Sequence, residues 1–206
     1  MFESLLPQFI VLWAVIDPIG TIPVYLAKTA QFTPVEQKQV ARKAILVSAA
    51  ILLFFLFAGK LTLEQLDIKI AAFQVAGGLV LFVFSLTMIF GESKPHQEIR
   101  LESDRNDVAV FPIAVPSIAS PGAMMTLVLL SDRNGFALLD YVWTMLVVFS
   151  VLLITYLLLL IANDIQRWIS VTGAAVISRI MGLILASVAI NNTLTGLQKF
   201  FNCTGI

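Results

Sequence analysis

The sequence predicts an all-α integral membrane protein whose six transmembrane helices form an inverted repeat of two three-helix halves. Three observations support this prediction. Apolar residues make up 59% of the 206 residues and charged residues only 13%, whereas a soluble domain has roughly 45–50% and 25%. The apolar residues gather in six spans, and six helices of about 20 residues would use nearly all of them. The first and fourth spans are each interrupted near the middle by a helix-start signal, which predicts two broken helices.

Composition excludes several classes of function. The formal net charge is zero, so no basic surface favours a nucleic-acid partner. The chain has one cysteine, Cys203, and one histidine, His96, so it offers no internal disulfide and no cysteine- or histidine-rich metal site. We therefore expect no metal and no cofactor. The motifs of serine hydrolases and zinc proteases are absent, and we expect no enzyme activity.

The six spans account for most of the chain. They cover roughly residues 5–27, 44–59, 70–91, 108–130, 141–162 and 174–198. Their length and their lack of alternating polarity favour helices over the strands of a barrel. Inside lipid every backbone polar group must be bonded, which a helix achieves within one segment. Asp17 and Arg179 are the two charged residues that lie within a span.

The longest connection is residues 92–107, a charged stretch that contains Pro95 and His96. We expect a flexible cytoplasmic loop there, between a first repeat of residues 1–91 and a second of residues 108–206. An even number of helices puts both termini on one side of the membrane. The loops on the side opposite the termini contain twice as many lysine and arginine residues as the side of the termini. The positive-inside rule assigns those loops to the cytoplasm and therefore places both termini outside it.

A repeated pattern divides the chain into halves. Pro18 interrupts the first span and Pro121 the fourth, while Gly78 opens Gly-Leu-Val-Leu in the third span and Gly182 opens Gly-Leu-Ile-Leu in the sixth. The spacing from proline to glycine is 60 residues in one half and 61 in the other. Because each half has an odd number of helices, the halves must point in opposite directions, as in many secondary transporters.

Each interruption carries the residues that start a helix. Asp17 and Ser120 suit the N-cap position, and each is followed by a proline, which suits the first helical position. A half-helix that begins there exposes N–H groups and about half a positive charge. Two such ends would form an anion pocket for a carboxylate, and the carbonyl ends of the preceding half-helices would suit an ammonium group. The pocket could therefore hold a small zwitterion such as an amino acid.

The candidate substrate-binding residues are those of the two interruptions. They are Asp17, Pro18, Ile19, Gly20, Thr21, Ser120, Pro121, Gly122 and Ala123. The alternative is a structural kink, because proline and glycine are common in membrane helices. Two symmetric interruptions with caps favour the functional interpretation. Asp17 is either a proton carrier or only a helix cap, and both alternatives stay open.

Five further residues in the spans are candidates for the pathway or for packing. Gln74 could contact substrate, or it could bond to a neighbouring helix. Gly77 and Gly78 favour close helix packing. Arg179 lies near the end of its span, which favours snorkelling or a salt bridge to a loop acid over substrate contact. Asn191 could line the pathway or lie at the wet membrane interface.

Four segments carry a family resemblance: residues 17–23 (DPIGTIP), 110–116 (VFPIAVP), 120–123 (SPGA) and 178–185 (SRIMGLIL). In this order they resemble the MarC family of integral membrane proteins, also described as SnatA-type neutral amino acid transporters. The resemblance spans nearly the whole chain. It implies a six-helix protein of a bacterial or archaeal inner membrane with inverted three-plus-three topology. It also implies proton-coupled transport of small neutral amino acids such as glycine and alanine, with substrate at residues 17–20 and 120–123.

The sequence thus favours a secondary transporter of small neutral amino acids that works by alternating access within the lipid bilayer. Two alternatives stay open. An exporter of amino acids or other small metabolites would share this architecture, and so would a membrane protein that transports nothing. No nucleotide-binding loop is present, so ATP bound to this chain does not drive transport. The sequence is compatible with an oligomer.

Overall fold

The computed structural model describes residues 2–90, 108–131, 138–168 and 171–204. All regular elements within these ranges are helices: α1 (Phe2–Ile16), α2 (Pro18–Lys28), α3 (Pro34–Gln65), α4 (Ile70–Phe90), η1 (Ala109–Ile118), α6 (Pro121–Ser131), α7 (Leu138–Leu160), α8 (Ala162–Trp168) and α9 (Val171–Thr204). The expected loop at residues 92–107, with His96, lies outside the described residues.

The described helices provide five or six candidate membrane spans. Five stretches are long and apolar enough by themselves: Leu5–Lys28, Pro34–Gln65, Ile70–Phe90, Leu138–Leu160 and Arg179–Asn202. A sixth arises if η1 and α6, which meet at an angle of 55°, are taken as one bent span. These positions match the six apolar spans of the sequence, so the prediction of an all-helical chain with several membrane spans is confirmed.

Helix α3, which contains the second apolar span (residues 44–59), is longer than that span. It begins at Pro34 because Thr33 and Glu36 form a capping box. The Thr33 backbone N–H donates to Glu36 Oε2 at 2.7 Å, and Thr33 Oγ1 accepts from the Glu36 backbone N–H at 3.4 Å. The first turns of α3 carry charged residues, so they are helical without being apolar. For this reason the hydropathy of the sequence predicts a helix that starts too late.

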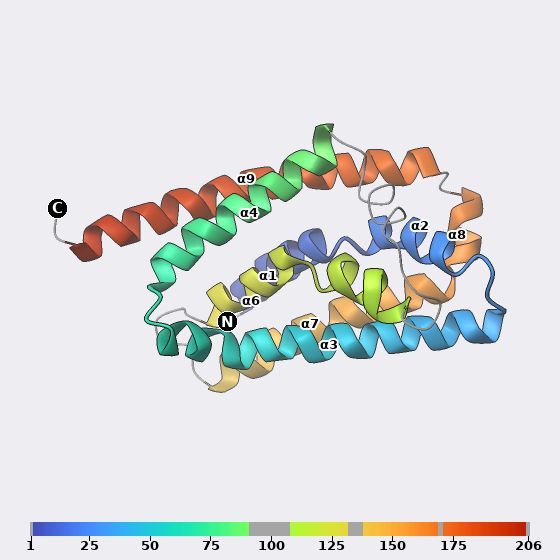
Figure 1. Cartoon of the computed structure of the whole chain (residues 1–206), viewed down its shortest axis with the longest axis horizontal. Coiled ribbons are helices and arrows are strands. Elements are labelled where there is room, and N and C mark those ends of the chain that lie inside the picture. The colour runs from blue at the N-terminus through green and yellow to red at the C-terminus, as the bar shows by residue number, and fades with distance from the viewer. Residues whose placement is uncertain (1, 91–107, 132–137, 169–170, 205–206) are drawn as a thin grey trace.

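The helices form three layers (Figure 1). α4 and α9 pack side by side along one edge, α1, α2, η1 and α6 fill the middle, and α3 and α7 lie along the opposite edge. Successive spans run in opposite directions, so both ends of the chain lie toward the same end of the bundle (Figure 1).

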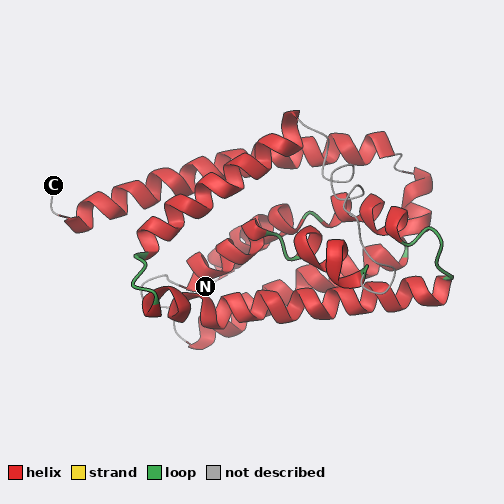
Figure 2. Ribbon diagram, viewed as in Figure 1, coloured by secondary structure: helices red, strands yellow, loops and turns green. Residues whose placement is uncertain are grey.

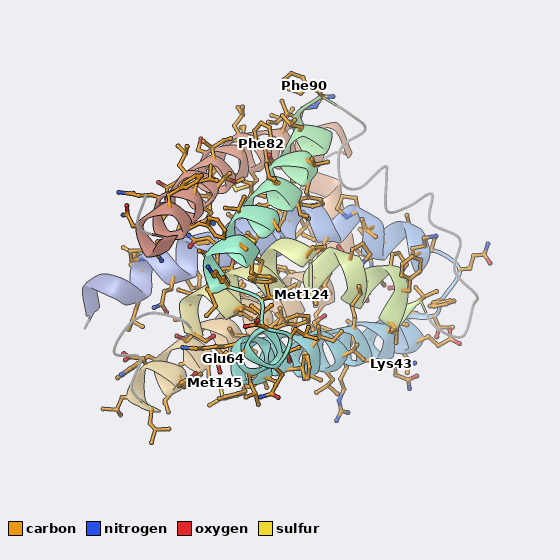
Figure 3. All side chains as sticks on the ribbon, turned by 60° about the vertical axis from the view of Figure 1, so that its left-hand side comes forward. Lys43, Glu64, Phe82, Phe90, Met124 and Met145 are labelled. Atoms are coloured by element: carbon orange, nitrogen blue, oxygen red, sulfur yellow. The ribbon has the colours of Figure 1, made fainter. Side chains whose placement is uncertain are left out.

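Burial differs between the layers. In the first span, Leu5–Lys28, 67% of the most apolar window is buried within the protein, against 22–39% in the other four single spans. The outer faces of α3, α4, α7 and α9 carry large exposed apolar side chains such as Phe57, Val83, Leu153 and Leu183. Phe90, at the end of α4, points away from the bundle (Figure 3). Exposed apolar surface on this scale fits contact with lipid, and irregular backbone in the middle layer is shielded from it.

Candidate functional site

The first interruption is a one-residue junction between α1 and α2. Asp17 has φ 48° and ψ 68°, a left-handed conformation that aspartate tolerates better than most residues. Its Oδ1 atom accepts a hydrogen bond from the Gly20 backbone N–H at 3.1 Å. Its carbonyl oxygen accepts from both the backbone N–H and the hydroxyl of Thr21, each at 3.1 Å. Asp17 therefore caps α2, in the position that its residue type predicts.

The second interruption has the same cap built from a different residue. Ser120 Oγ accepts a hydrogen bond from the Ala123 backbone N–H at 3.2 Å, and the Ser120 carbonyl accepts from Met124 at 3.0 Å. The preceding segment, η1, is irregular. Phe111 (φ −132°, ψ 123°) and Val115 (φ −128°, ψ 127°) are extended because a proline follows each of them.

The two interruptions meet inside the bundle. Ser120 Oγ donates a hydrogen bond to the Val15 carbonyl oxygen at 2.8 Å. The hydroxyls of Thr21 and Ser117 lie 3.0 Å apart in a second hydrogen bond. Val15 is in the last turn of α1, where carbonyl groups lack helical partners. Figure 2 shows the two short loop segments in the middle of the bundle rather than at its ends. The structure thus brings the predicted residues 17–21 and 120–123 to one place.

This place is closed in the conformation described. Asp17 is 3% exposed, and Thr21, Ser117, Ser120 and Ala123 are completely buried. Pro18 and Gly20 are buried, Ile19 is half-buried and Pro121 is exposed. A methyl group added at Gly122 would lie 2.7 Å from Leu81 Cδ1. The open pocket expected between the helix ends is therefore replaced by direct contact, since the Ser120–Val15 hydrogen bond leaves no space for a ligand between those atoms.

At the start of both α2 and α6, one backbone N–H group takes part neither in the cap nor in the first helical hydrogen bond. The proline at the first position has no N–H. In each helix the cap side chain accepts from the backbone N–H of the third residue, Gly20 or Ala123. The first helical hydrogen bond is donated by the backbone N–H of the fourth residue. The second residues, Ile19 and Gly122, carry the N–H groups that neither interaction uses. Two equivalent donors therefore lie at the paired helix ends, where the helix dipoles favour negative charge.

A polar cavity of about 560 Å³ lies between α1, α4, α6 and α9. Two predicted residues, Gln74 and Asn191, belong to its wall rather than to the paired helix ends. Its other polar residues are Gln8, Thr126, Ser187, Asn192 and Lys199. Thr126 Oγ1 donates to the Gly122 carbonyl at 2.8 Å, so the wall of this cavity is one helical turn from the second interruption.

A second cavity, also of about 560 Å³, lies near the opposite end of the bundle. Its polar wall residues come from α3 and the connection before it and include Gln31, Glu36, Gln39 and Lys43. Figure 3 shows Lys43 on α3. Residues of α1 and α6 line the first cavity, and Ala109 of η1 lines the second, so each cavity borders a helix that leads to an interruption. The closed region therefore lies between two polar cavities.

α4 and α9 pack against each other, and each contributes a glycine to the contact. A methyl group at Gly78 would lie 3.0 Å from the Ala189 carbonyl, and one at Gly182 would lie 3.2 Å from the Ser85 carbonyl. Most close neighbours of the two glycines are reciprocal: Ala189 and Thr193 for Gly78, and Ser85 and Ile89 for Gly182. Met88, the nearest neighbour of Gly182 at 3.0 Å, has no counterpart among the nearest atoms to Gly78. A shift of 104 positions (78 to 182, 85 to 189, 89 to 193) converts one set into the other.

The remaining predicted residues have clear positions. Gly77 packs against Met125 of α6, which agrees with a packing role. Arg179 is exposed on α9 and lines neither cavity. Sequence reasoning missed Ser117, Gln8 and Thr126. Each is a polar residue between two apolar neighbours in an apolar span, which is a usable signal, but the sequence does not show toward which neighbouring helix it points.

Comparisons with known proteins agree on one family. A family model described as "MarC family integral membrane protein" matches residues 2–201. The UPF0056 membrane protein YvbG of Bacillus subtilis is 35% identical over 98% of this chain and 97% of its own length. MJ1677 of Methanocaldococcus jannaschii is 32% identical (91% and 92% covered), and YhcE of Escherichia coli is 31% identical (94% and 91%). No solved structure matches the chain significantly.

Proposed function

The chain belongs to the MarC family of integral membrane proteins, and from that premise we propose that it is a secondary transporter of small neutral amino acids such as glycine and alanine. The observation that carries the proposal is the meeting of two capped helix starts, at Asp17 and Ser120, inside the bundle. Interrupted helices whose N-termini bind an anionic substrate group near the bilayer midplane are a recurring device of secondary transporters.

The architecture that we propose is an inverted repeat with broken first and fourth helices. Two sets of equivalent contacts support it. The caps at Asp17 and Ser120 bond to Gly20 and Ala123, the same position in each helix. Most neighbours of Gly78 and Gly182 are also reciprocal between the halves. A repeat inverted about an axis in the membrane plane produces such pairs because each helix meets its counterpart.

The mechanism is alternating access at the paired helix starts. The conformation described holds them together by the Ser120–Val15 and Thr21–Ser117 hydrogen bonds, with a polar cavity toward each end of the bundle. Separation of these contacts would expose the N–H groups of Ile19 and Gly122 to a substrate carboxylate. It would also release the Val15 carbonyl, which suits an ammonium group.

Asp17 is the residue that we assign to proton coupling. Among the described residues it is the only buried carboxylate, and a buried carboxylate inside a membrane is costly unless it is paired or protonated. It also lies at the point where the halves must separate. Protonation there would change the charge of the opening site during each transport cycle.

We place the protein in a bacterial or archaeal inner membrane, with both termini outside the cytoplasm. Relatives in bacteria and archaea and the lysine and arginine distribution support this assignment. A reporter that is active only in the cytoplasm, fused to the C-terminus, is expected to be inactive. Activity of that fusion would contradict the orientation.

Uptake by reconstituted protein tests the function. Proteoliposomes that contain the full chain should accumulate radiolabelled glycine or alanine with saturable kinetics, and an inward proton gradient should increase the rate. Efflux from preloaded vesicles, measured under the reverse gradient, distinguishes an exporter from an importer. Absence of saturable transport in both directions, under every ion gradient, would contradict the proposal.

A further inference from the structure

The cavity between α1, α4, α6 and α9 has a role that the paired helix starts do not explain. Polar side chains from three helices converge on it: Gln8 of α1, Gln74 of α4, and Asn191 and Asn192 of α9. Packing alone would fill such a space with apolar groups, because burial of an unbonded polar group costs free energy. Convergent polar groups in a cavity of this size are typical of a ligand site.

Gln74 gives the strongest indication. The residue is 6% exposed, and in the part of the chain that the structure describes its side chain makes no hydrogen bond. A buried amide has two donors and two acceptor positions and is almost always bonded. Because Gln74 lines the cavity and its amide atoms are not among the buried atoms without a partner, the amide faces the cavity, where a solute or a water molecule can bond to it. By contrast, Gln8 is held by Thr144, whose hydroxyl lies 3.4 Å from Gln8 Oε1.

The charge of the wall selects the class of ligand. Lys199 is the only charged residue among the described residues that line the cavity. Lys199 is exposed, so its ammonium group acts on solutes at the entrance. A single positive charge without a counter-charge attracts carboxylates and disfavours cations.

We propose that this cavity is a loading site that binds a small solute bearing a carboxylate and neutral hydrogen-bonding groups. Lys199 attracts the carboxylate at the entrance, and Gln74 bonds to the solute deeper in the cavity. Thr126, bonded to the Gly122 carbonyl, lies on the way to the second interruption. The proposal rests on the proposed function for the choice of amino acids as the solute.

Direct binding to the full chain in lipid nanodiscs tests the site. The probes are glycine and L-alanine, with glycinamide as a cation that lacks the carboxylate. We expect Gln74→Leu to weaken binding of glycine and alanine about tenfold, the worth of one well-made buried hydrogen bond. Lys199→Gln should weaken it about threefold and abolish the preference for glycine over glycinamide.

A matched pair of threonine variants controls for packing. Thr126 and Thr155 are both buried and both donate to the carbonyl four residues earlier at 2.8 Å, but only Thr126 lines the cavity. Thr126→Val should weaken binding severalfold, and Thr155→Val should leave it unchanged. Equal affinities in wild type, Gln74→Leu and Lys199→Gln, or no binding of glycine and alanine to the wild type, would overturn the proposal.

Thiol labelling keeps the test independent of how well Gln74→Leu folds. In a Cys203→Ser background, Gln74→Cys should react with a small anionic methanethiosulfonate faster than with a cationic one, and glycine or alanine should slow the reaction. Labelling unaffected by either amino acid would overturn the proposal. Binding of glycine or alanine without any uptake would support the loading site and refute transport. Uptake with the same KM in the wild type and in Gln74→Leu would support transport and refute the loading site.

Discussion

The two interrupted helices share their backbone geometry and differ in their chemistry. Both helix starts are capped at the third residue, by Asp17 at 3.1 Å and by Ser120 at 3.2 Å. Asp17 Oδ1 accepts from the Gly20 backbone N–H, an interaction to which a carboxylate oxygen is suited as a cap. A serine hydroxyl can both accept and donate, and Ser120 accepts from Ala123 while donating to Val15 across the junction.

In the inverted repeat that we propose, this division of roles accounts for the different cap residues of the two halves. Ser120 supplies one of the two hydrogen bonds that join the interruptions, and Asp17 supplies the carboxyl group. Gly78 of α4 and Gly182 of α9 are the same residue type, because each only has to allow the backbone of the facing helix to come close.

The largest expected loss of stability concerns the contact between α4 and α9 at Gly78 and Gly182. Gly78→Leu and Gly182→Leu should each lower the free energy of unfolding by about 3 kcal/mol, because the added side chain meets the backbone of the facing helix. Unfolding in detergent, followed by circular dichroism, measures the loss. Ala76→Leu, at an exposed position of α4, should change it by less than about 0.5 kcal/mol. A large loss for one glycine and none for the other would refute the reciprocal packing.

Replacement of Asp17 separates its two roles. Asp17→Ala should lower the free energy of unfolding by about 2.5 kcal/mol, because it removes the cap and leaves alanine in a left-handed conformation. Asp17→Asn keeps a good cap that tolerates this conformation, so stability should change by less than about 1 kcal/mol. Its uptake should no longer respond to a proton gradient. Unchanged coupling in Asp17→Asn would leave Asp17 as a cap alone.

Ser120→Ala removes both the cap and the bond between the halves. We expect a loss of about 2 kcal/mol, with about 1 kcal/mol from each interaction. Ser150→Ala is the control, because Ser150 is exposed and bonds only to its own helix at Leu146. Thermal unfolding of the purified variants measures both. A loss no larger than that of Ser150→Ala would mean that the interruptions are not joined through Ser120.

The smallest effect concerns the second contact between the halves. Thr21→Val should cost about 1 kcal/mol more than Thr155→Val. Both threonines are completely buried and bond to the carbonyl four residues earlier, but only Thr21 also meets Ser117. The same unfolding assay applies. Equal losses in the two variants would show that the Thr21–Ser117 contact contributes nothing.

Much of this arrangement could be predicted because it is local. An N-cap residue followed by proline starts a helix wherever it occurs, so Asp17 and Ser120 were found from sequence alone. The apolar spans follow from composition. The helices run farthest beyond them at both ends of α3 (Pro34–Gln65) and at the end of α9 (Thr204), where polar and charged residues belong to the helix.

The non-local part could not be predicted. Thr21 and Ser117 are 96 positions apart, and nothing in the sequence specifies that their hydroxyls meet. The assignment of Gln74 to a cavity with Gln8 and Thr126 depends on which face of each helix turns inward. An apolar span with little periodicity does not reveal that face, because lipid and protein interior are equally apolar.

A reversible cross-link between the interruptions tests the central claim most directly. Thr21→Cys and Ser117→Cys, combined in a Cys203→Ser background, place two thiols where hydroxyls now lie 3.0 Å apart. Glycine or alanine uptake is measured before oxidation, after it and after reduction, with mass spectrometry to confirm the disulfide. Alternating access predicts uptake that disappears on oxidation and returns on reduction. Full uptake by the cross-linked protein would contradict it.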